Sequence, residues 1–432
     1  MNDVTDVPVA LLGYGTVGSA VTRLLLENED DIVRATGHRL RVVRALVRDP
    51  GAERGFPAPD GVLTTDFGSI RDDPEIELVA EVMGGVEPTG GHVLELLAAG
   101  KPLVTANKQL LAQRGAELFA AASRAGVQLR FEASVCGAIP VIKVLREALV
   151  VSNVHRVLGI VNGTTNYILT RMEAGDTYDE ALAEAQRLGF AEADPTEDVS
   201  GADAAAKMAI LATIAFGSRV TLDDVPYEGI TGIEPGHIRA AHEMGTVVRL
   251  IGRATLVGGA VDVRVQPALV DRHHPLAAVE GAFNAVMLQG DAIREIVLEG
   301  PGAGGIETAS AVVADMVSIV GTTGTGFLQD DPTWRELARL EPGELRTPYY
   351  LNIEVDDRAG VLAHLAERFA AHGVSVARLV QHQSERGADL HVVTHEAPAG
   401  AVDAALLDIA ALPETHGTPM RLAVIASSDS GL

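Results

Sequence analysis

The chain has 432 residues, enough for about three domains of ordinary size. Hydrophobic residues make up 47% and charged residues 22%, which excludes a wholly disordered chain. The net charge of −25 argues against nucleic acid or an anionic membrane as a partner, because clustered Lys and Arg bind both. The single cysteine, Cys136, excludes an internal disulfide framework.

The sequence is not expected to carry a secretory signal or a membrane-spanning helix. No apolar run reaches the roughly 18 residues of a membrane-spanning helix. The acidic segment 1–6 lacks the basic start of a secretory signal. We therefore expect a cytoplasmic protein that acts on small molecules.

The first third of the chain alternates between strand and helix patterns. Short apolar runs predict strands at 7–12, 40–47, 76–82, 102–105 and 128–133. Helical composition lies between them, at 19–27, 92–99 and 117–124. This alternation predicts βαβ units and a parallel sheet.

The pattern changes after residue 133. We expect helices at 139–149, 202–216 and 308–320, and strands of a second, mixed sheet at 154–161, 261–269, 285–288 and 292–298. Residues 321–347, rich in Gly, Thr, Pro and Asp, are typical of a linker. A strand at 349–356 and a helix at 361–372, followed by further strands and a second helix, predict a small last domain.

Residues 13–18, Gly-Tyr-Gly-Thr-Val-Gly, follow the first predicted strand and open the first helix. Such glycines allow a tight turn and bring a pyrophosphate close to the helix N-terminus. An ordinary glycine turn is the alternative, but a strand before and a helix after are the context of a dinucleotide-binding Rossmann domain.

The residue after the second strand bears on the choice between NAD and NADP. An acid at this place binds the ribose 2′-hydroxyl of NAD, whereas this chain has Arg48, with Arg54 a little further on. Because arginine pairs with a 2′-phosphate, we expect NADP. NAD stays open because Asp49 follows directly, and a solvated loop position is the alternative for Arg48.

Asp203 and Lys207 lie four residues apart on one face of the predicted Ala-rich helix. Their neighbours are mostly apolar, so the two charges either pair tightly or shift their pKa values. A lysine with a lowered pKa, held by an aspartate, can protonate the alkoxide that forms when a hydride adds to a carbonyl. A buried structural ion pair is the alternative.

Two further segments supply candidates for the same site. Lys108 follows a predicted strand end, where ligands bind in open α/β sheets, and could polarise a carbonyl or hold a carboxylate. Glu192, in the acidic loop 191–201, is the candidate for binding a substrate ammonium, with a solvated loop as the alternative. Only four of the 34 basic residues are lysines, which favours a function for those retained.

The segment 132–140, Glu-Ala-Ser-Val-Cys-Gly-Ala-Ile-Pro, places a carboxylate before a turn that contains glycine. Such a turn can hold a hard monovalent cation through main-chain carbonyls, although a buried turn is the simpler alternative. Cys136 within it is most simply a small core residue.

Together, several of these motifs resemble the homoserine dehydrogenase family over about residues 7–330. The resemblance lies in AQRLGFAEADPTEDVSGADAAAK at 185–207, NGTTNYIL at 162–169, TANK at 105–108 and EASVCGAIP at 132–140. Cys136 stands where that family is expected to have Ala or Gly. Residues 349–432, with DRAGVL at 357–362, resemble an ACT domain, which senses amino acids.

The resemblance implies the NAD(P)-dependent interconversion of L-aspartate 4-semialdehyde and L-homoserine, a step towards threonine and methionine. It implies that Lys207 is the proton donor, that Asp203 and Glu192 bind the amino-acid substrate, and that Lys108 is a second active-site lysine. The implied nucleotide contacts are Gly13, Gly15, Thr16, Val17, Gly18, Thr105, Lys108, Gly189, Gly302 and Gly304.

The resemblance also implies a sodium or potassium site and an effector. The cation ligands would be Glu132, Val135, Gly137 and Ile139, the last three through main-chain oxygens. The ACT domain implies feedback inhibition by L-threonine, and Gly360 would either contact the effector or serve only as a turn glycine.

We therefore predict an α/β chain built from a Rossmann domain (1–134), an α+β substrate and dimerisation domain (135–320), a linker (321–347) and a ferredoxin-like ACT domain (348–432). A homodimer or homotetramer is expected. One alternative is a 2-hydroxyacid dehydrogenase with an ACT tail, which would rely on a catalytic histidine that is not found in a convincing context here. The other is a non-catalytic regulator that senses nucleotide and amino acid.

Overall fold

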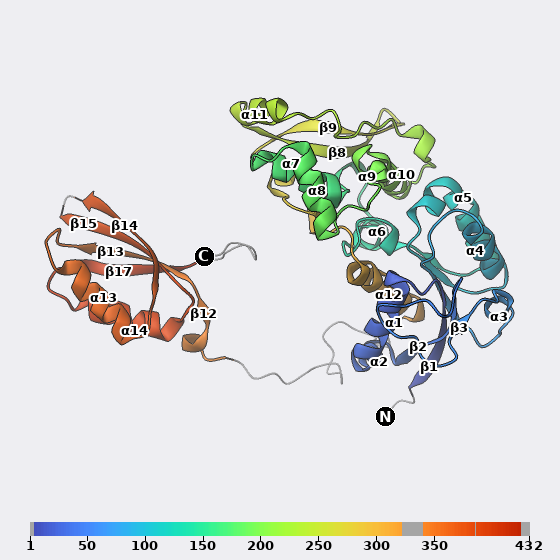
Figure 1. The fold of residues 1–432 in the computed structure, drawn as a ribbon, viewed down its shortest axis with the longest axis horizontal. Coiled ribbons are helices and arrows are strands. Elements are labelled where there is room, and N and C mark those ends of the chain that lie inside the picture. Colours follow the sequence, from blue (N-terminus) through green and yellow to red (C-terminus); the bar gives the residue numbers. More distant parts are fainter. Residues whose placement is uncertain (1–3, 322–339, 385, 425–432) are drawn as a thin grey trace. The chain divides into compact units, whose positions relative to one another are not determined.

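The computed structural model describes residues 4–321, 340–384 and 386–424. Two compact units divide the chain between Thr333 and Trp334, and each is described by itself (Figure 1). Residues 322–339, which make up most of the predicted linker, lie outside the described residues.

The first unit begins with a six-stranded parallel sheet, which confirms the predicted βαβ pattern. Its order is β3 (Leu63–Thr64), β2 (His38–Leu46), β1 (Thr5–Leu12), β4 (Leu78–Glu81), β5 (Leu103–Thr105) and β6 (Leu129–Arg130). This order, 3-2-1-4-5-6, is typical of dinucleotide-binding sheets. The last strand is shorter than predicted because the main-chain N–H of Glu132 bonds to Asp315 at 2.8 Å, and residues 132–134 turn into η1 (Glu132–Ser134).

Helices cover both faces of this sheet (Figure 1). One layer holds α1 (Thr16–Glu27), α2 (Glu29–Thr36) and α12 (Gly305–Val320), and the other holds α3 (Gly68–Arg71), α4 (Thr89–Ala98) and α5 (Lys108–Ala125). Alternate residues of each strand supply the two cores, so Val9 and Leu11 pack with the α1 layer and Ala10 and Leu12 with the α4 layer. The helix α12 comes late in the sequence, yet it returns to pack against α1.

The second sheet is antiparallel throughout its four strand pairings, so the expectation of a mixed sheet is wrong. Its order is β11 (Arg294–Pro301), β10 (Phe283–Gly290), β7 (Val154–Ile160), β8 (Thr246–Val257) and β9 (Ala260–Asp271). Tight hairpins join β8 to β9 and β10 to β11, and such short connections permit only antiparallel neighbours. Sequence reasoning missed β8 because Arg249 and Arg253 interrupt its apolar run.

The helices of this region carry the chain around the second sheet. In order they are α6 (Val141–Lys143), η2 (Val144–Ala148), α7 (Gly163–Glu173), α8 (Tyr178–Leu188), α9 (Thr196–Val199), α10 (Ala202–Phe216), η3 (Leu222–Asp224), α11 (Pro235–Glu243) and η4 (Pro275–Ala278). The predicted helix at 202–216 has these bounds in the structure. Its small residues allow close packing on β8, where a Cβ at Gly252 would collide with Met208.

The second unit has the order β13 (Tyr349–Val355), α13 (Val361–Ala371), β14 (Val376–Ser384), β15 (Gly387–Thr394), α14 (Ala399–Ala410) and β17 (Thr415–Ala423). Its antiparallel sheet runs β14-β15-β13-β17, which confirms the predicted ferredoxin-like arrangement. Both helices pack on one face of the sheet (Figure 1). A two-stranded ribbon of β12 (Arg346–Thr347) and β16 (Ala397–Pro398), preceded by η5 (Pro342–Glu344), completes the unit.

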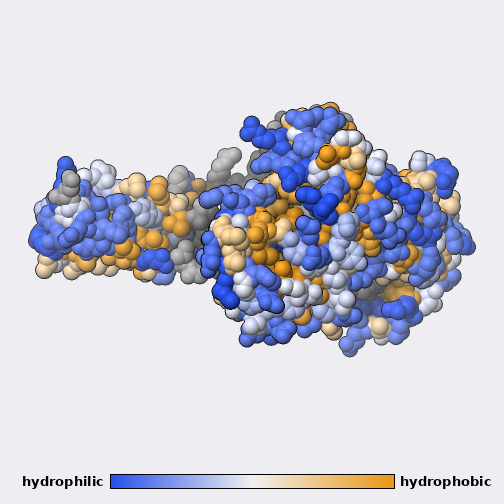
Figure 2. All heavy atoms as spheres, turned by 90° about the horizontal axis from the view of Figure 1, so that it is seen from above, coloured by the Kyte–Doolittle hydropathy of each residue, from blue (hydrophilic) through white to orange (hydrophobic). Residues whose placement is uncertain are grey.

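Hydrophilic side chains cover most of the face of the larger unit that Figure 2 shows, and apolar colour is confined to smaller areas between them. Among the described residues, none of the helices is both long and apolar enough to span a membrane.

Candidate active site

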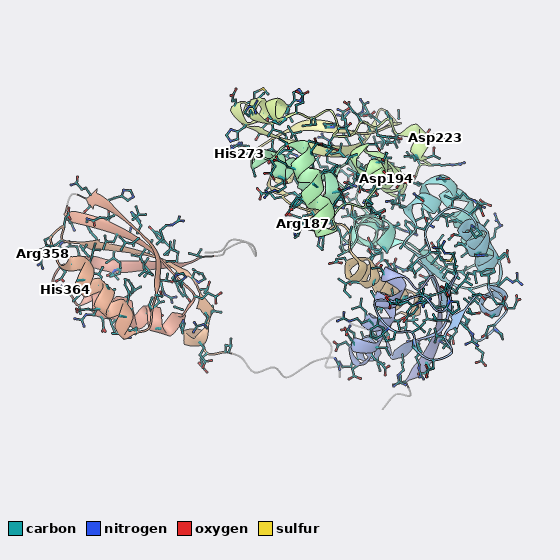
Figure 3. All side chains as sticks on the ribbon, viewed as in Figure 1. Arg187, Asp194, Asp223, His273, Arg358 and His364 are labelled. Atoms are coloured by element: carbon teal, nitrogen blue, oxygen red, sulfur yellow. The ribbon has the colours of Figure 1, made fainter. Side chains whose placement is uncertain are left out.

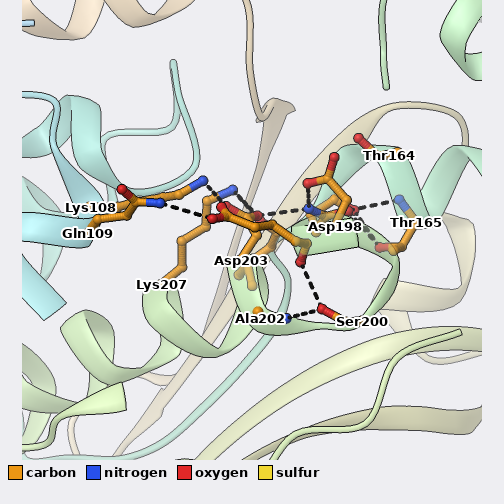
Figure 4. Close-up of polar contacts among 12 residues, drawn as sticks. Lys108, Gln109, Thr164, Thr165, Asp198, Ser200, Ala202, Asp203 and Lys207 are labelled. Atoms are coloured by element: carbon orange, nitrogen blue, oxygen red, sulfur yellow. Dashed lines mark hydrogen bonds and ion pairs between the residues drawn. The ribbon is translucent and has the colours of Figure 1, made fainter. Parts of the chain in front are cut away.

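The centre of the candidate site is the buried carboxylate of Asp203, which bridges two lysines from different parts of the first unit (Figure 4). Asp203 lies in the first turn of α10, behind Gly201, whose positive φ of 88° starts the helix. One carboxylate oxygen pairs with Lys207 Nζ at 2.8 Å, and the other pairs with Lys108 Nζ. Lys207 also donates to the main-chain oxygen of Val161 at 2.8 Å. The structure thus brings together the three predicted catalytic residues.

The Asn162 side chain ties this cluster to the second sheet. Asn162 follows β7 and caps α7, with its Oδ1 accepting the N–H of Thr165 at 2.8 Å. Its Nδ2 donates to Asp203 at 2.8 Å and to Asp198 at 2.7 Å. The Asn162 amide therefore holds the carboxylates of Asp198 and Asp203 side by side at the N-terminal end of α10.

The pKa values of the cluster follow from burial and from the ion pairs. Burial would raise the pKa of Asp203, but the ammonium groups of Lys207 and Lys108 outweigh it and hold this pKa well below its usual range. Burial likewise lowers the pKa of Lys207, but the Asp203 carboxylate outweighs it, and the result is a raised pKa. The expectation of a lowered Lys207 pKa is therefore wrong, because that lysine is not only buried but also paired.

Lys108 reaches the cluster from the carboxyl end of the parallel sheet. It is the first residue of α5, which Asn107 caps by accepting the N–H of Leu110 at 3.0 Å. The predicted cofactor residue Thr105 lies just before, buried, with its hydroxyl on Glu81 at 2.6 Å. The same hydroxyl accepts the N–H of Asn107 at 3.0 Å, so Thr105 positions the turn that carries Lys108.

The glycine loop 13–18 has the geometry that a dinucleotide needs. Gly13 has a φ of 106°, and a Cβ on Gly18 would collide with the carbonyl oxygen of Gly13. A Cβ on Gly15 would meet open space. No side chain caps α1 within the described residues, so the N–H groups of its first turn face outward next to Thr16 and Val17.

The second predicted glycine turn lies beside the first, although almost 290 residues separate them in sequence. A Cβ on Gly305 would come within 2.7 Å of Thr16 Cγ2. The turn of Gly302 and Gly304 therefore opens α12 next to the start of α1. Two helix N-termini converge on one place, which suits a pyrophosphate.

The remaining predicted ligand contacts lie at the rim. Arg48 is exposed directly after β2, and the structure gives it no hydrogen bond or ion pair within residues 4–321. Gly189 ends α8 with a φ of 80°. The exposed Glu192 has no side-chain bond to the Asp203 cluster among the described residues, although Gln186 Nε2 fixes its main-chain oxygen at 3.1 Å.

Figure 3 labels Arg187 on α8 and Asp194 in the loop that follows it. Both are engaged locally, since Arg187 pairs with Glu184 at 2.6 Å and Asp194 accepts the N–H of Thr196 at 3.1 Å. Of the acidic residues around Glu192, only Asp198 is linked by a side chain to the Asp203 cluster in the described part of the chain.

The predicted cation loop forms a tight turn next to Gly302. Cys136 and Gly137 both have positive φ, at 59° and 54°, and a Cβ on Gly137 would lie 2.7 Å from the Gly302 oxygen. The Glu132 carboxylate accepts the N–H groups of Ile142 and Lys143 at 2.7 and 2.8 Å. Burial raises the pKa of Glu132 to about 7, against the effect of these two bonds.

Sequence reasoning assigned no role to Asn162, Asp198 or Glu81. Asn162 had a visible signal, because an Asn between a strand and a helix is typical of an N-cap, but nothing in the sequence shows where its second amide atom points. Asp198 was one acid among four in its loop. Glu81 ends a buried strand and looked like the polar edge of an apolar run.

Comparisons with known proteins agree with this geometry. The family model for the homoserine dehydrogenase NAD-binding domain matches residues 13–132, the model for homoserine dehydrogenase matches 140–317, and the ACT domain model matches 349–414. The homoserine dehydrogenase of Bacillus subtilis is 41% identical over 396 residues, covering 90% of this chain and 91% of the relative. That of Mycobacterium tuberculosis is 45% identical over 422 residues, covering 94% and 93%.

Solved structures give the same result. A homoserine dehydrogenase from Thiobacillus denitrificans matches with a TM-score of 0.69 and 39% identity, covering 97% of this chain and 98% of that one. A hyperthermophilic archaeal homoserine dehydrogenase in complex with NADPH matches with a TM-score of 0.60 and 27% identity, covering 73% and 98%. These matches set aside both the hydroxyacid dehydrogenase and the non-catalytic regulator. The chain therefore belongs to the homoserine dehydrogenase family, the NAD(P)-dependent oxidoreductases that interconvert L-aspartate 4-semialdehyde and L-homoserine.

Proposed function

We propose that Lys207 is the proton donor of this homoserine dehydrogenase and that Asp203 and Lys108 hold it in its charged form. The observation that carries the proposal is the buried Asp203 carboxylate shared by two lysines. An ammonium group has three protons to donate. Lys207 gives one to Asp203 and one to the Val161 oxygen, both at 2.8 Å, which leaves the third for a substrate oxygen.

In the reductive direction the bound dinucleotide supplies a hydride to the aldehyde carbon. Lys207 donates its free proton to the oxygen that becomes the hydroxyl of homoserine. In the oxidative direction the neutral Lys207 amine accepts that proton. The raised pKa of Lys207 favours the donor form at neutral pH, so replacing Lys207 is the direct test of the proposal.

We propose that Glu192 and Asp203 take part in binding the amino-acid substrate. Because Asp203 already accepts bonds from Lys108, Lys207 and Asn162, we propose that Asp198 joins them as a further acid for the substrate ammonium. Burial raises the pKa of Asp198, against the bond from Asn162, and a cationic ligand would reverse that shift.

We propose NADP as the preferred dinucleotide. The residues fit the group, since a Cβ on Gly18 would collide with the Gly13 oxygen inside the tight loop, Gly15 next to it faces open space, and two helix starts without side-chain caps in the described residues meet at Thr16. We assign further contacts with the dinucleotide to Gly13, Gly15, Val17, Gly189, Gly304, Thr105 and Lys108. Arg48, exposed beyond β2, would hold the 2′-phosphate, and a relative with this fold is described in complex with NADPH.

Arg48→Ala is expected to weaken NADP binding about tenfold and to leave NAD binding unchanged, because a charge-assisted bond to a phosphate is lost. Titration of nicotinamide fluorescence with NADPH and NADH measures both affinities. Arg54→Ala is the matched control, since Arg54 donates to the main-chain oxygens of Asp49 and Pro50 in its own loop. Equal losses for the two dinucleotides would contradict the role of Arg48.

We propose that the turn 132–139 can hold a sodium or potassium ion. The consecutive positive φ values of Cys136 and Gly137 turn successive carbonyls to one side, which fits main-chain ligation by Val135, Gly137 and Ile139. Glu132 is the fourth proposed ligand of the cation. This ion would order the loop beside Gly302.

We propose that the ACT unit binds L-threonine and that binding lowers turnover. A cavity of about 270 Å³ lies at the loop between β13 and α13, lined by residues 355–362 with Gln381, Ala388 and Leu390. Gly360 starts α13 with a φ of 97°, so the helix N-terminus can face a carboxylate. Arg358 and His364 lie at this end of the unit (Figure 3).

L-Threonine is expected to lower the wild-type rate several-fold and to have little effect on Asp357→Ala, whose carboxylate is the candidate partner of the effector ammonium. Asp403→Ala is the control, because Asp403 is a paired surface acid on α14 of the same unit. Initial rates with and without threonine measure the effect. Inhibition that persists in Asp357→Ala would contradict this effector site.

We propose the domain limits 1–134, 135–320, 321–347 and 348–432, with α12 returning to the first domain. We also propose a cytoplasmic homodimer or homotetramer. In support of self-association, the exposed Leu269 on β9 lines an apolar cavity on the second sheet together with Arg156 and Arg253. Light scattering of the purified protein measures the assembly.

A further inference from the structure

The carboxamide of Asn284 is buried beside the Gly302 turn, and no hydrogen-bond partner for it lies among the described residues. Asn284 lies on β10 with an exposed fraction of 0%, and neither Nδ2 nor Oδ1 is bonded to another described residue. Buried amides are nearly always paired, because an unpaired one loses its bonds to water without replacement. The buried Asn166 differs, since only its Oδ1 lacks a partner and its Nδ2 donates to the Val279 and Gly281 oxygens at 3.1 and 3.0 Å.

Three features of the site surround this carboxamide. A Cβ on Gly302 would collide with it, so the second glycine turn packs directly on Asn284. Burial raises the pKa of the Cys136 thiol to about 11, while the Lys207 ammonium and the Asn284 amide oppose that rise, which places both near the thiol. A thiol is too weak a hydrogen-bonding group to satisfy an amide. Asn284 therefore packs against the Gly302 turn, on which Gly137, the residue after Cys136, also packs.

We propose that Asn284 recognises the nicotinamide carboxamide of the bound dinucleotide. The inference rests on the proposed function, which has the pyrophosphate at the two helix starts and the substrate at Lys207. The reacting ring has to lie between them, and Asn284 packs on the Gly302 turn at the dinucleotide end of that interval. One carboxamide complements another, with Nδ2 donating to the ligand oxygen and Oδ1 accepting from the ligand NH₂. Because Gly302 packs on Asn284, binding has to move this turn.

The test is Asn284→Leu, which keeps the shape of the side chain and removes its polar atoms. NADPH binding, measured by calorimetry, is expected to weaken at least about tenfold, because both hydrogen bonds to the ligand carboxamide are lost. The Tm of the free enzyme is expected to stay or rise, because an unpaired polar group has gone. Asn166→Leu is the matched control. It should lower Tm and leave NADPH affinity unchanged, because its amide bonds to the protein itself.

A cofactor analogue identifies the atoms involved. The 3-acetylpyridine analogue of NADP has a methyl group in place of the carboxamide NH₂. The wild-type enzyme should bind it about tenfold more weakly than NADP, and Asn284→Leu should bind both alike. If the leucine variant fails to fold, Asn284→Ala serves for the same comparison.

An unchanged NADPH affinity in Asn284→Leu, or a lower Tm with unchanged affinity, would overturn the inference and make Asn284 a structural residue. A rise in the KM for homoserine alone would assign the residue to the substrate and would also overturn it. Neither outcome would contradict the proposed role of Lys207 as the proton donor. That role fails only if turnover survives the loss of Lys207.

Discussion

Lys207→Met is expected to lower turnover in both directions by about 10²–10⁴-fold, the usual contribution of a positioned general acid or base. Methionine keeps the length and apolar stem of the lysine but has no proton to give. The dinucleotide contacts lie at other residues, so NADPH affinity should stay within about twofold of the wild type. Stopped-flow measurement of nicotinamide absorbance gives the rate, and calorimetry gives the affinity.

Lys101→Met is the matched control for this variant. Lys101 is also a buried lysine, but it donates to the main-chain oxygens of Asp73 and Ile76, at 2.6 and 2.9 Å. Its loss should lower Tm and leave kcat near the wild-type value, because these bonds hold only the connection into β4. If Lys207→Met kept more than a tenth of the wild-type kcat, another group would have to be the donor.

The limits of sequence reasoning are clearest in the two sheets. The parallel sheet was predicted because short apolar runs alternate with helical segments, a pattern that local composition carries. The second sheet was taken as mixed because strand direction depends on which strands become neighbours. The buried Arg249 in β8 hid that strand, since its charge is paired with Glu173 at 2.7 Å, a residue far away in sequence.

The site shows the same division between local and distant information. The pairing of Asp203 with Lys207 follows from a spacing of four on a helix, so the sequence could predict it. The contribution of Lys108 requires α5 and α10 to meet, and it is this packing of distant segments that sets the pKa values of the cluster. Asn284 had no sequence signal, because an unpaired amide is visible only once its surroundings are known.

Asp203→Asn is expected to change the pH dependence as well as the rate. Without the carboxylate, burial lowers the pKa of Lys207 with only Cys136 and Asp198 left to oppose it. Oxidation of homoserine needs the neutral amine, so its rate rises as Lys207 loses its proton. In the wild type this rise lies above the usual pH range of a lysine, and in the variant it should move to lower pH. Reduction of the semialdehyde needs the ammonium and should fall off at lower pH than in the wild type. Rates in both directions between pH 6 and about 11 measure the two shifts.

The same substitution should also destabilise the fold, because it leaves two ammonium groups facing a neutral amide. Breaking a buried ion pair by removing one partner costs about 3–5 kcal/mol, although the half-exposed Lys108 lessens the loss here. The pair stabilises the wild type between the lowered pKa of Asp203 and the raised pKa of Lys207, and this stability is lost as pH leaves either limit. Urea unfolding at pH 7 measures the difference.

Asp262→Asn is the control for both readouts, since Asp262 also joins two basic side chains, Arg253 and Arg264, but does so on the partly exposed β9. It should lose at most about 1 kcal/mol and keep the wild-type pH profile, because exposed pairs contribute little and this one does not face Lys207. An Asp203→Asn enzyme with the wild-type pH profile would show that Asp203 does not control the charge of Lys207. The role of the carboxylate would then be confined to holding α5 against α10.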